Sequence, residues 1–555
     1  MTQFKKEIKA YVLKNALEFG KADPGKILPK LFQHGLKKEE IKEIMPEIQK
    51  IVDEINALSQ EERQLLFANY ENIVKIKEEK PRDLPELPKT KGKKPVFRVA
   101  PFPSGALHLG NAKTFILNAL YAKKYKGKLL LVIDDTIGSA EKPIEKESYN
   151  LIEYALAWLG VKHVGKIIYK SDRLRTYYQY AKKLIEKDKA YVCYCTQEEM
   201  KENRIKGIEC SCRQFPIKIQ LKRWKEMFKM KEGQATLRIK TDMNHSNPAF
   251  RDRVLFKISQ RPHPRVRKKY RVWPTLEMSW AIDDHLLKIT HIIRGNDLMI
   301  ESDVERYIWD IFRWPHPEII HTGLVQIEGI KISKSKAQKE IRSGEYIGWD
   351  DPRTWSIQSL ARRGITPEAI EKFVKEIGIN KQDIIVPIDS LYAINRSLSD
   401  AIAPRYSFIS NPIKLDITNK PDWKTIEIPI HPDKPEKRKI SLNNIYISQA
   451  DFNKFESEEI RLLHLYNIKL NKNAQTAELT SIDNKNIPKI NWVSDKLKAR
   501  ILMPDTTWIE GIADSGISKL TKGAILQFER FGFVKYDKKT HSKNEVIYEF
   551  WFTHK

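Results

Sequence analysis

The residues best suited to chemistry stand in the stretch 98–117, where an apolar run enters a loop of proline and glycine and a helical pattern follows. A strand, a tight loop and a helix start bring backbone N–H groups and the helix dipole to a phosphate. His108 and Asn111 are three residues apart, so both can face one ligand from the first helical turn, and Gly110 lets that ligand approach the backbone. The stretch therefore predicts a phosphate-binding loop.

Two strand-like runs end in side chains that could meet a ligand at this loop. The apolar run 129–133 is followed by Asp134, and the run 289–293 by Arg294. Ligands of open α/β sheets bind beyond the carboxyl ends of the strands, and arginine grips a carboxylate bidentately. Each residue alone could equally cap a helix or form a surface ion pair, and it is the phosphate-type loop that favours a ligand site.

A lysine and serine cluster, Lys331-Ile-Ser-Lys-Ser-Lys336, follows Gly329. Such a cluster is often only an exposed loop. As a mobile loop it could place two ammonium groups on a triphosphate, a point-charge role that lysine serves well.

All four cysteines of the chain stand close together, as Cys193-x-Cys195 and Cys210-x-Cys212. Two close pairs can close a tetrahedral thiolate site for zinc. Ordinary buried cysteines would scatter through a chain of 555 residues, and cytosolic proteins seldom keep disulfides, so we favour zinc over both alternatives. Four protein ligands leave no open position, which makes the predicted role structural.

The charge of the chain points to a polyanionic partner. The formal net charge is +27 at pH 7, and an excess of this size often marks nucleic-acid binding. The segment 263–271 interleaves arginine and lysine with Tyr270, just before Trp273, which suits contact with a sugar-phosphate chain. Solubility and a solvated surface are the alternatives, and nucleic acid is the preferred interpretation.

The elements that must position these residues follow from periodicity. Residues 1–75 repeat apolar side chains at helical spacing, and 76–94 has the proline and lysine content of a linker. From 95 to 335 short apolar runs alternate with helical patterns, as in a parallel α/β sheet, with an insertion at about 190–250. Residues 401–555 alternate as the strands of a barrel domain.

No apolar run approaches the eighteen or so residues of a membrane span, and the first residues contain no apolar secretory core. We therefore expect a cytoplasmic protein without a membrane partner. At 555 residues the chain is too long for one core, so several domains are expected, with a monomer as the default state.

These motifs together resemble a known family. The segment 98–111, Arg-Val-Ala-Pro-Phe-Pro-Ser-Gly-Ala-Leu-His-Leu-Gly-Asn, resembles the HIGH motif of class I aminoacyl-tRNA synthetases, and 331–335 resembles their KMSKS loop. Segments similar to the archaeal glutamyl type lie at 134–136, 263–265, 283–287, 293–295 and 349–353. The stretches 13–25, 430–435 and 446–452 extend the resemblance over nearly the whole chain.

The resemblance implies an α/β multidomain enzyme. Its catalytic domain would be Rossmann-like, with an inserted acceptor-binding and zinc subdomain, a helical N-terminal extension, a helical stem-contact region at 336–400 and C-terminal all-β anticodon-binding barrels. Such an enzyme joins glutamate to ATP with release of pyrophosphate and then acylates the 3′ end of tRNA(Glu). Mg²⁺ would be bound mainly through the nucleotide, Zn²⁺ would be structural, and tRNA(Gln) stays open as a second substrate.

The resemblance also implies roles for individual residues. The catalytic set would stabilise charge on the phosphates and consists of His108, Asn111, Lys331 and Lys334. ATP binding adds Pro101, Ser104, Gly105, Gly110 and Ser333. The glutamate pocket would contain Arg98, Asp134, Arg294, Leu276 and Trp280. Contacts to tRNA would come from His263, Arg265, Asp350 and Arg353.

Selectivity depends on Arg294, which would pair with the side-chain carboxylate of glutamate. A buried guanidinium left unpaired by an amide should exclude glutamine. A structural ion pair of Arg294 with Asp297 or Asp283 is the alternative for this residue. Family members usually carry histidine at the position of Asn111 and tyrosine near Leu276. These departures leave a catalytically silent tRNA-binding paralogue as an alternative function, and the C-terminal barrel, which both types share, leaves a glutaminyl-type ligase as another.

Overall fold

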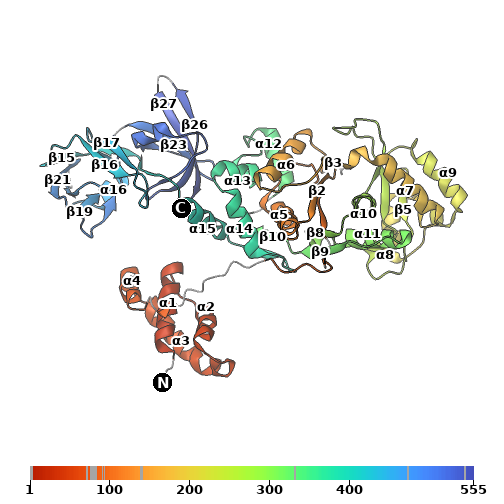
Figure 1. The fold of residues 1–555 in the computed structure, drawn as a ribbon, viewed down its shortest axis with the longest axis horizontal. Coiled ribbons are helices and arrows are strands. Elements are labelled where there is room, and N and C mark those ends of the chain that lie inside the picture. The colour runs from red at the N-terminus through yellow and green to blue at the C-terminus, as the bar shows by residue number, and fades with distance from the viewer. Residues whose placement is uncertain are drawn as a thin grey trace. The chain divides into compact units, whose positions relative to one another are not determined.

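The computed structural model describes residues 4–70, 73–74, 84–90, 92, 94–137, 142–330, 333–471, 474–494, 496–542 and 545–555. The chain folds as two compact units, residues 1–82 and residues 83–555 (Figure 1). Among the helices that lie in the described ranges, none is both long and apolar enough to cross a membrane.

The first unit consists of short helices: α1 (Lys5–Phe19), α2 (Pro24–Leu31), α3 (Ile41–Asn56) and α4 (Gln60–Ala68). They bury a shared apolar core that includes Ile8, Val12 and Ile48. The carboxylate of Asp23 accepts a hydrogen bond from the N–H of Gly25 at 2.8 Å and so caps α2. The helices that periodicity predicts at the N-terminus are confirmed.

A five-stranded parallel sheet with the strand order β3-β2-β1-β8-β9 lies at the centre of the second unit. Its strands are β1 (Val96–Val99), β2 (Lys128–Ile133), β3 (Ile168–Tyr169), β8 (His291–Gly295) and β9 (Glu318–Thr322). The chain leaves β1 toward β2 on one side and later forms β8 on the other side. The switch point of this Rossmann-like sheet therefore lies between β1 and β8, and ligands bind beyond the strand ends at such a point.

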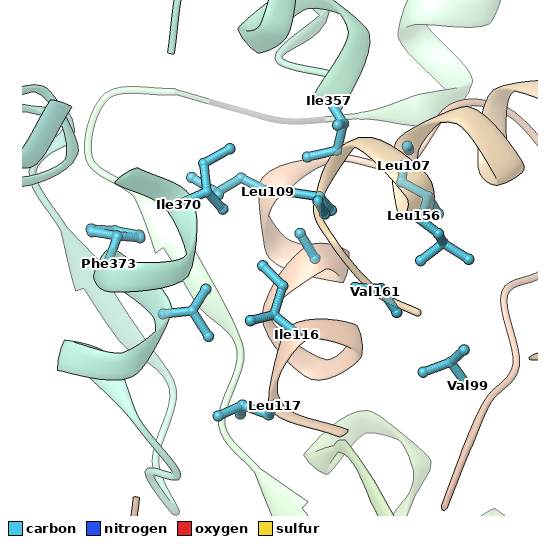
Figure 2. Packing of buried hydrophobic residues seen from close by; sticks show 14 of the residues in the cluster. Val99, Leu107, Leu109, Ile116, Leu117, Leu156, Val161, Ile357, Ile370 and Phe373 are labelled. Carbon is cyan, nitrogen blue, oxygen red and sulfur yellow. The ribbon is translucent and has the colours of Figure 1, made fainter. Parts of the chain in front are cut away.

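Five helices follow these strands or the insertion between them: α5 (Leu109–Lys124), α6 (Lys146–Trp158), α7 (Leu174–Glu186), α10 (Leu276–Leu286) and α11 (Met299–Phe312). Figure 2 shows Ile116 and Leu117 of α5 in one apolar core with Ile370 and Phe373 of α14 (Pro367–Ile377). Val99 of β1 belongs to the same core. Because α5 is buried against both the sheet and α14, the first turn of α5 is held in place.

The second half of the predicted linker packs on the second unit. Leu84 and Leu87 are buried in its core. The Nε2 atom of His291 donates a hydrogen bond to the carbonyl of Pro88 at 2.9 Å. These leucines bury apolar surface that a solvated linker would expose, which explains why this part is folded. Residues 76–83 of the predicted linker lie outside the described residues.

An antiparallel sheet with the order β4-β5-β6-β7 is inserted between α7 and α10. Its elements are β4 (Ala190–Cys193), α8 (Gln197–Lys206), α9 (Ile217–Met227), β5 (Thr236–Ile239), β6 (Val254–Ile258) and β7 (Val272–Pro274). The insertion extends beyond the predicted 190–250, because β6 and β7 complete the same sheet.

Helices α12 (Lys334–Ser343), α13 (Ile357–Arg363) and α15 (Ile388–Asp400) lie with α14 between the parallel sheet and the C-terminal strands (Figure 1). Strand β10 (Val325–Ile327) pairs in parallel with β11 (Ile384–Val386). Helix α13 joins the two regions. The N–H of Ile357 donates to the carbonyl of Leu107 at 2.8 Å, and Arg362 Nη2 donates to Asp537 Oδ2 at 2.8 Å.

The C-terminal region consists mainly of strands, as the alternation predicts. A seven-stranded sheet has the order β12-β25-β26-β27-β23-β24-β13, and a five-stranded sheet has the order β15-β21-β20-β19-β22. Only Ser407 separates the edge strands β12 (Arg405–Tyr406) and β13 (Phe408–Ser410), so the larger sheet curls toward a barrel. The other elements are β14 (Pro412–Lys414), β15 (Asp416–Thr418), β16 (Thr425–Pro429), β17 (Lys437–Ser441), β18 (Tyr446–Ser448), α16 (Gln449–Lys454), β19 (Glu459–Leu462), β20 (Asn467–Leu470), β21 (Thr476–Ser481), β22 (Lys489–Ile490), β23 (Leu497–Leu502), β24 (Trp508–Ala513), β25 (Ile525–Phe528), β26 (Gly532–Ser542) and β27 (Glu545–His554).

Candidate active site

A cavity of about 1000 Å³ opens at the carboxyl ends of β1 and β8. Its wall contains most of the residues predicted to bind a nucleotide or an amino acid: Arg98, Pro101, Ser104, His108, Gly110, Asn111, Asp134, Leu276, Trp280, Arg294, Ser333 and Lys334. The fold therefore brings residues separated by more than 200 positions into one site. Lys331, predicted to act with Lys334, lies outside the described residues.

Gly105, predicted to contact ATP, packs against an aromatic ring. A Cβ atom at this position would lie 2.5 Å from Cη2 of Trp349, and the backbone φ is +146°. The ring is fixed because Trp349 Nε1 donates to Glu147 Oε1 at 3.0 Å. Glycine at position 105 therefore allows the close approach that shapes the loop before His108.

His108 and Asn111 lie at the start of α5, as their spacing predicts. His108 is the N-cap residue, with φ −118° and ψ 169°. The Nδ1 atom of His108 and the Oδ1 atom of Asn111 are buried and have no hydrogen-bond partner within the described chain. Because buried polar atoms are normally paired, two such atoms on the wall of a cavity indicate a ligand-binding position.

The electrostatics of this turn depend on Lys334. Burial, and then the nearby Lys334 ammonium, lower the pKa of His108 to about 3, so the imidazole is neutral at pH 7. Burial and Lys142 lower the pKa of Lys334 to about 8, so its ammonium is mostly charged at pH 7. The cavity thus combines neutral hydrogen-bonding groups on α5 with a positive charge on α12.

Binding of a phosphate-bearing substrate should weaken above pH 8. The protonated Lys334 ammonium attracts the phosphates, and its pKa is about 8 in the free protein. We expect kcat/KM for ATP to fall about tenfold per pH unit above that value, because this ratio reports the protonation state of the free enzyme. Lys334→Arg should remove the decline, since arginine stays charged. If kcat/KM for ATP declines equally above pH 8 in the unaltered protein and in Lys334→Arg, the titrating group is not Lys334.

Three buried ion pairs surround the ring of Trp280. Arg98 pairs bidentately with Asp284 (Nη2–Oδ2 2.9 Å). Lys170 Nζ lies 3.3 Å from Asp134 Oδ2, and Arg294 pairs with Glu305 through two contacts of 2.9 Å. The three cationic groups lie over the ring at these distances from its centroid: Arg98 Cζ 4.7 Å, Lys170 Nζ 4.9 Å and Arg294 Cζ 5.2 Å. Each charged residue predicted to bind glutamate therefore already has an opposite charge beside it.

The predicted structural partners of Arg294 are wrong. Its partner is Glu305, whereas Asp283 accepts hydrogen bonds from Arg173 Nε at 2.7 Å and from Tyr177 Oη at 2.6 Å. The premise that an amide would leave the Arg294 guanidinium unpaired also fails, because Glu305 neutralises it in the absence of a substrate. Selectivity therefore cannot be derived from Arg294 alone.

Lys170, Asp284 and Glu305 are the site residues that sequence reasoning missed. The sequence could have indicated Asp284, since it is the second acid of a pair that follows an apolar helical stretch. Glu305 lies on α11, eleven residues after Arg294, on a helix with many acidic residues. No pattern in the sequence around Lys170 indicates a site residue. It is fully buried, and its Nζ donates to Ser279 Oγ at 2.8 Å.

The first two residues predicted to contact tRNA are held by internal bonds. His263 is buried; its Nδ1 accepts from the N–H groups of Arg265 and Val266, which leaves Nε2–H to donate to the carbonyl of Asp135 at 2.7 Å. The Cζ atom of Arg265 lies 3.5 Å from the centroid of the Tyr169 ring, and the Arg265 side chain is partly exposed. His263 can therefore affect a nucleic acid only through the loop that it shapes, whereas Arg265 offers part of its guanidinium to solvent.

Asp350 and Arg353 lie in the segment before α13. Asp350 Oδ2 accepts from Arg362 Nη1 at 2.6 Å, and Arg353 pairs with Asp351 through Nε–Oδ1 at 2.9 Å. Both side chains remain partly exposed. Their position beside α13 places them near the junction with the C-terminal strands.

The four cysteines form one cluster. Their sulfur atoms all lie within 4.8 Å of one another, and Cys193 Sγ is 3.7 Å from Cys210 Sγ. A tetrahedron with Zn–S bonds of about 2.3 Å has an S–S edge of roughly 3.8 Å, so the spacing fits a tetrathiolate zinc site. The donor set also fits, because soft thiolates select zinc among common divalent ions.

A buried arginine accompanies this cluster. Arg238 Nη1 lies 3.7 Å from Cys193 Sγ and 3.9 Å from Cys210 Sγ, while its Nε donates to the carbonyl of Asp252 at 2.7 Å. Four thiolates around one divalent ion carry a net negative charge, which a buried guanidinium compensates. The backbone φ of Asp252 is +37°, and its side chain is held in place because Asp252 Oδ1 accepts a hydrogen bond from Arg213 Nη1 at 2.7 Å.

Comparison with known proteins gives consistent matches over nearly the whole chain. Residues 95–398 match the family described as "tRNA synthetases class I (E and Q), catalytic domain", and residues 403–486 and 478–537 match its two anti-codon binding domain families. A glutamate–tRNA ligase of Pyrococcus furiosus is 41% identical over 97% of this chain and 98% of its own length. The corresponding ligase of Methanocaldococcus jannaschii is 40% identical over 95% and 96%, and that of Methanothermobacter thermautotrophicus is 38% identical over 95% and 96%.

Proposed function

The chain belongs to the class I tRNA synthetases of the E and Q type, and on that premise we propose that it is a glutamate–tRNA ligase. The reaction has two steps. The α-carboxylate of glutamate attacks the α-phosphorus of ATP, and the bond to pyrophosphate breaks. A ribose hydroxyl at the 3′ end of tRNA(Glu) then takes the glutamyl group, and AMP leaves.

The observation that supports this proposal is the single cavity shared by the α5 turn, Lys334 and the pocket around Trp280. The α5 turn and Lys334 suit a triphosphate, and the part of the same cavity around Trp280 offers the Asp134 carboxylate and the Arg98 and Arg294 guanidinium groups to an amino acid. A carboxylate nucleophile is ionised at pH 7, so the reaction needs charge stabilisation and in-line placement rather than a general base.

The cavity contains a residue for each chemical requirement of the proposed reaction. Lys334 supplies positive charge for the phosphates, and the neutral His108 supplies a hydrogen bond at the helix start, where the dipole also favours negative charge. The Oδ2 atom of Asp134 has no hydrogen-bond partner in the described chain, although the Lys170 ammonium lies 3.3 Å from it, and it would bind the substrate ammonium group together with Lys170 as its counter-ion. Mg²⁺ would be held mainly by the nucleotide phosphates and would neutralise their charge.

Two further partners belong to the proposal. We assign Zn²⁺ to the cysteine cluster as a structural ion that holds β4 against the 210–212 turn. The C-terminal strands would bind the anticodon of tRNA, and Arg265, Asp350 and Arg353 would lie along its path. Whether tRNA(Gln) is also bound depends on contacts of those strands.

The proposal is tested by aminoacylation with purified protein and transcripts of both tRNA(Glu) and tRNA(Gln). We expect glutamate to be charged to tRNA(Glu) in an ATP-dependent reaction, with affinity for tRNA falling steeply as salt rises because phosphate contacts dominate. A protein that binds tRNA but forms no glutamyl-tRNA would instead be the silent paralogue. Charging of glutamine alone would indicate the glutaminyl type.

A further inference from the structure

Arg294 is neutralised by an acid of its own chain. Its Nη1 and Nη2 atoms lie 2.9 Å from Oε1 and Oε2 of Glu305, which is fully buried. The Nη2 atom also donates to Ser302 Oγ at 2.5 Å, and that hydroxyl lies 2.8 Å from His321 Nε2. Helix α11 thus occupies two of the three guanidinium nitrogens of Arg294.

Two buried donors beside this pair have no acceptor. They are the Nε atom of Arg294 and the Nε1 atom of Trp280, for which the described chain offers no hydrogen-bond partner. Both residues line the cavity and are 5% exposed. An acceptor from a ligand would satisfy them. A carboxylate oxygen and an amide carbonyl oxygen can both do so, and the two N–H groups by themselves do not distinguish the acid from the amide.

The charge around these donors does not distinguish the acid from the amide either. Arg98 is balanced by Asp284, and Lys170 lies beside Asp134. Burial, and then the Arg294 guanidinium, lower the pKa of His321 to about 4, so that imidazole is neutral at pH 7. A glutamate side chain therefore enters surroundings in which each nearby buried cation already has a counter-ion.

We propose that Glu305 sets the acid-versus-amide selectivity of this pocket, an inference that rests on the proposed function. Because Glu305 already neutralises Arg294, the carboxylate of glutamate gains less than it would from a free guanidinium. The amide of glutamine, for the same reason, leaves no charge unpaired. Glu305 is a specificity-determining residue that acts through Arg294 and weakens the preference for glutamate.

The test is Glu305→Gln, which keeps the side-chain length and one acceptor for Arg294 while removing the negative charge. The measured quantity is the ratio of kcat/KM for glutamate to kcat/KM for glutamine in ATP–pyrophosphate exchange, with tRNA(Glu) transcript present. We expect this ratio to rise by about tenfold to a hundredfold, the usual value of a hydrogen bond to a newly available charged group. An unchanged or lower ratio overturns the proposal.

Two control variants separate charge from geometry. Asp303→Asn removes an exposed carboxylate of the same helix, which pairs with Arg306, and should leave the ratio unchanged. Ser302→Ala removes a hydrogen bond to Arg294 without changing charge and should also leave it unchanged. A shift in Ser302→Ala as large as that in Glu305→Gln would show that geometry decides, and would overturn the role of the Glu305 charge.

The wild-type protein provides a second measurement that does not depend on the folding of any variant. A site whose polar groups strictly demand one substrate rejects the other by about 10⁴-fold or more. We expect a wild-type ratio below that value, and a higher ratio contradicts the proposal. Lack of activity with both amino acids would instead contradict the proposed function. Activity with glutamate and an unchanged ratio in Glu305→Gln would contradict only the role of Glu305.

Discussion

Lys334→Ala is expected to lower kcat/KM for ATP in pyrophosphate exchange by about 100- to 1000-fold, the usual effect of removing one preorganised charge-stabilising group. The charge of Lys334 lies at the wall of the cavity, and its presence lowers the pKa of His108. The neighbouring His108 is neutral and Asn111 carries no charge. Neither of these two neighbours can replace the positive charge of Lys334, so its loss should be severe.

Lys339→Ala is the matched control, because Lys339 lies on the same helix α12 and is exposed. It should retain activity close to that of the unaltered protein. Equal activity of Lys334→Ala and Lys339→Ala would remove Lys334 from the catalytic machinery. If both the altered and the unaltered proteins are inactive while tRNA binding persists, the silent paralogue is the better description.

The second large effect is expected at the cysteine cluster. Cys193→Ser/Cys210→Ser should abolish stoichiometric zinc and lower the thermal unfolding temperature of the inserted subdomain. Structural zinc in small peptides contributes about 10–16 kcal/mol of folding free energy. The loss should be compounded because Arg238, buried beside these two sulfur atoms, would face neutral hydroxyls. Metal analysis and calorimetry measure the two effects.

Ser211→Ala provides the control for this experiment, since Ser211 lies between two of the cysteines and is exposed. It should keep one zinc ion per chain and an unchanged unfolding temperature. A chelator should reproduce the effect of the double substitution in the unaltered protein. Unchanged zinc content after Cys193→Ser/Cys210→Ser would exclude the cluster as the metal site.

Local pattern was sufficient for a large part of the molecule. Alternation and helical periodicity depend on a few neighbouring residues, so the parallel sheet, the N-terminal helices and the C-terminal strands could be predicted. The short spacing of His108 and Asn111 within one turn, and of the cysteines in two pairs, constrains geometry in the same local way. The structure confirms that each group gathers at one place.

Domain limits were less predictable. Leu84 and Leu87 lie in a segment whose prolines and lysines indicate a linker, yet both are buried against the second unit. Composition records what a segment contains and does not record which surface it covers. The same reason explains why the insertion extends to Pro274, since β6 pairs with β5 and β7 pairs with β6, which adds both strands to the inserted sheet.

Local sequence patterns therefore indicate which chemical groups the chain offers: a phosphate loop, a thiolate cluster and a set of charged residues at strand ends. Which opposite charge neutralises each of those residues follows only from the folded chain. Asp284 is 186 residues from Arg98, and Lys170, just after β3, lies beside Asp134 at the end of the neighbouring strand β2. Glu305 neutralises Arg294 because α11 folds back beside β8. Ion pairs form between residues that the fold brings together, and no local pattern encodes which partner each charge will meet.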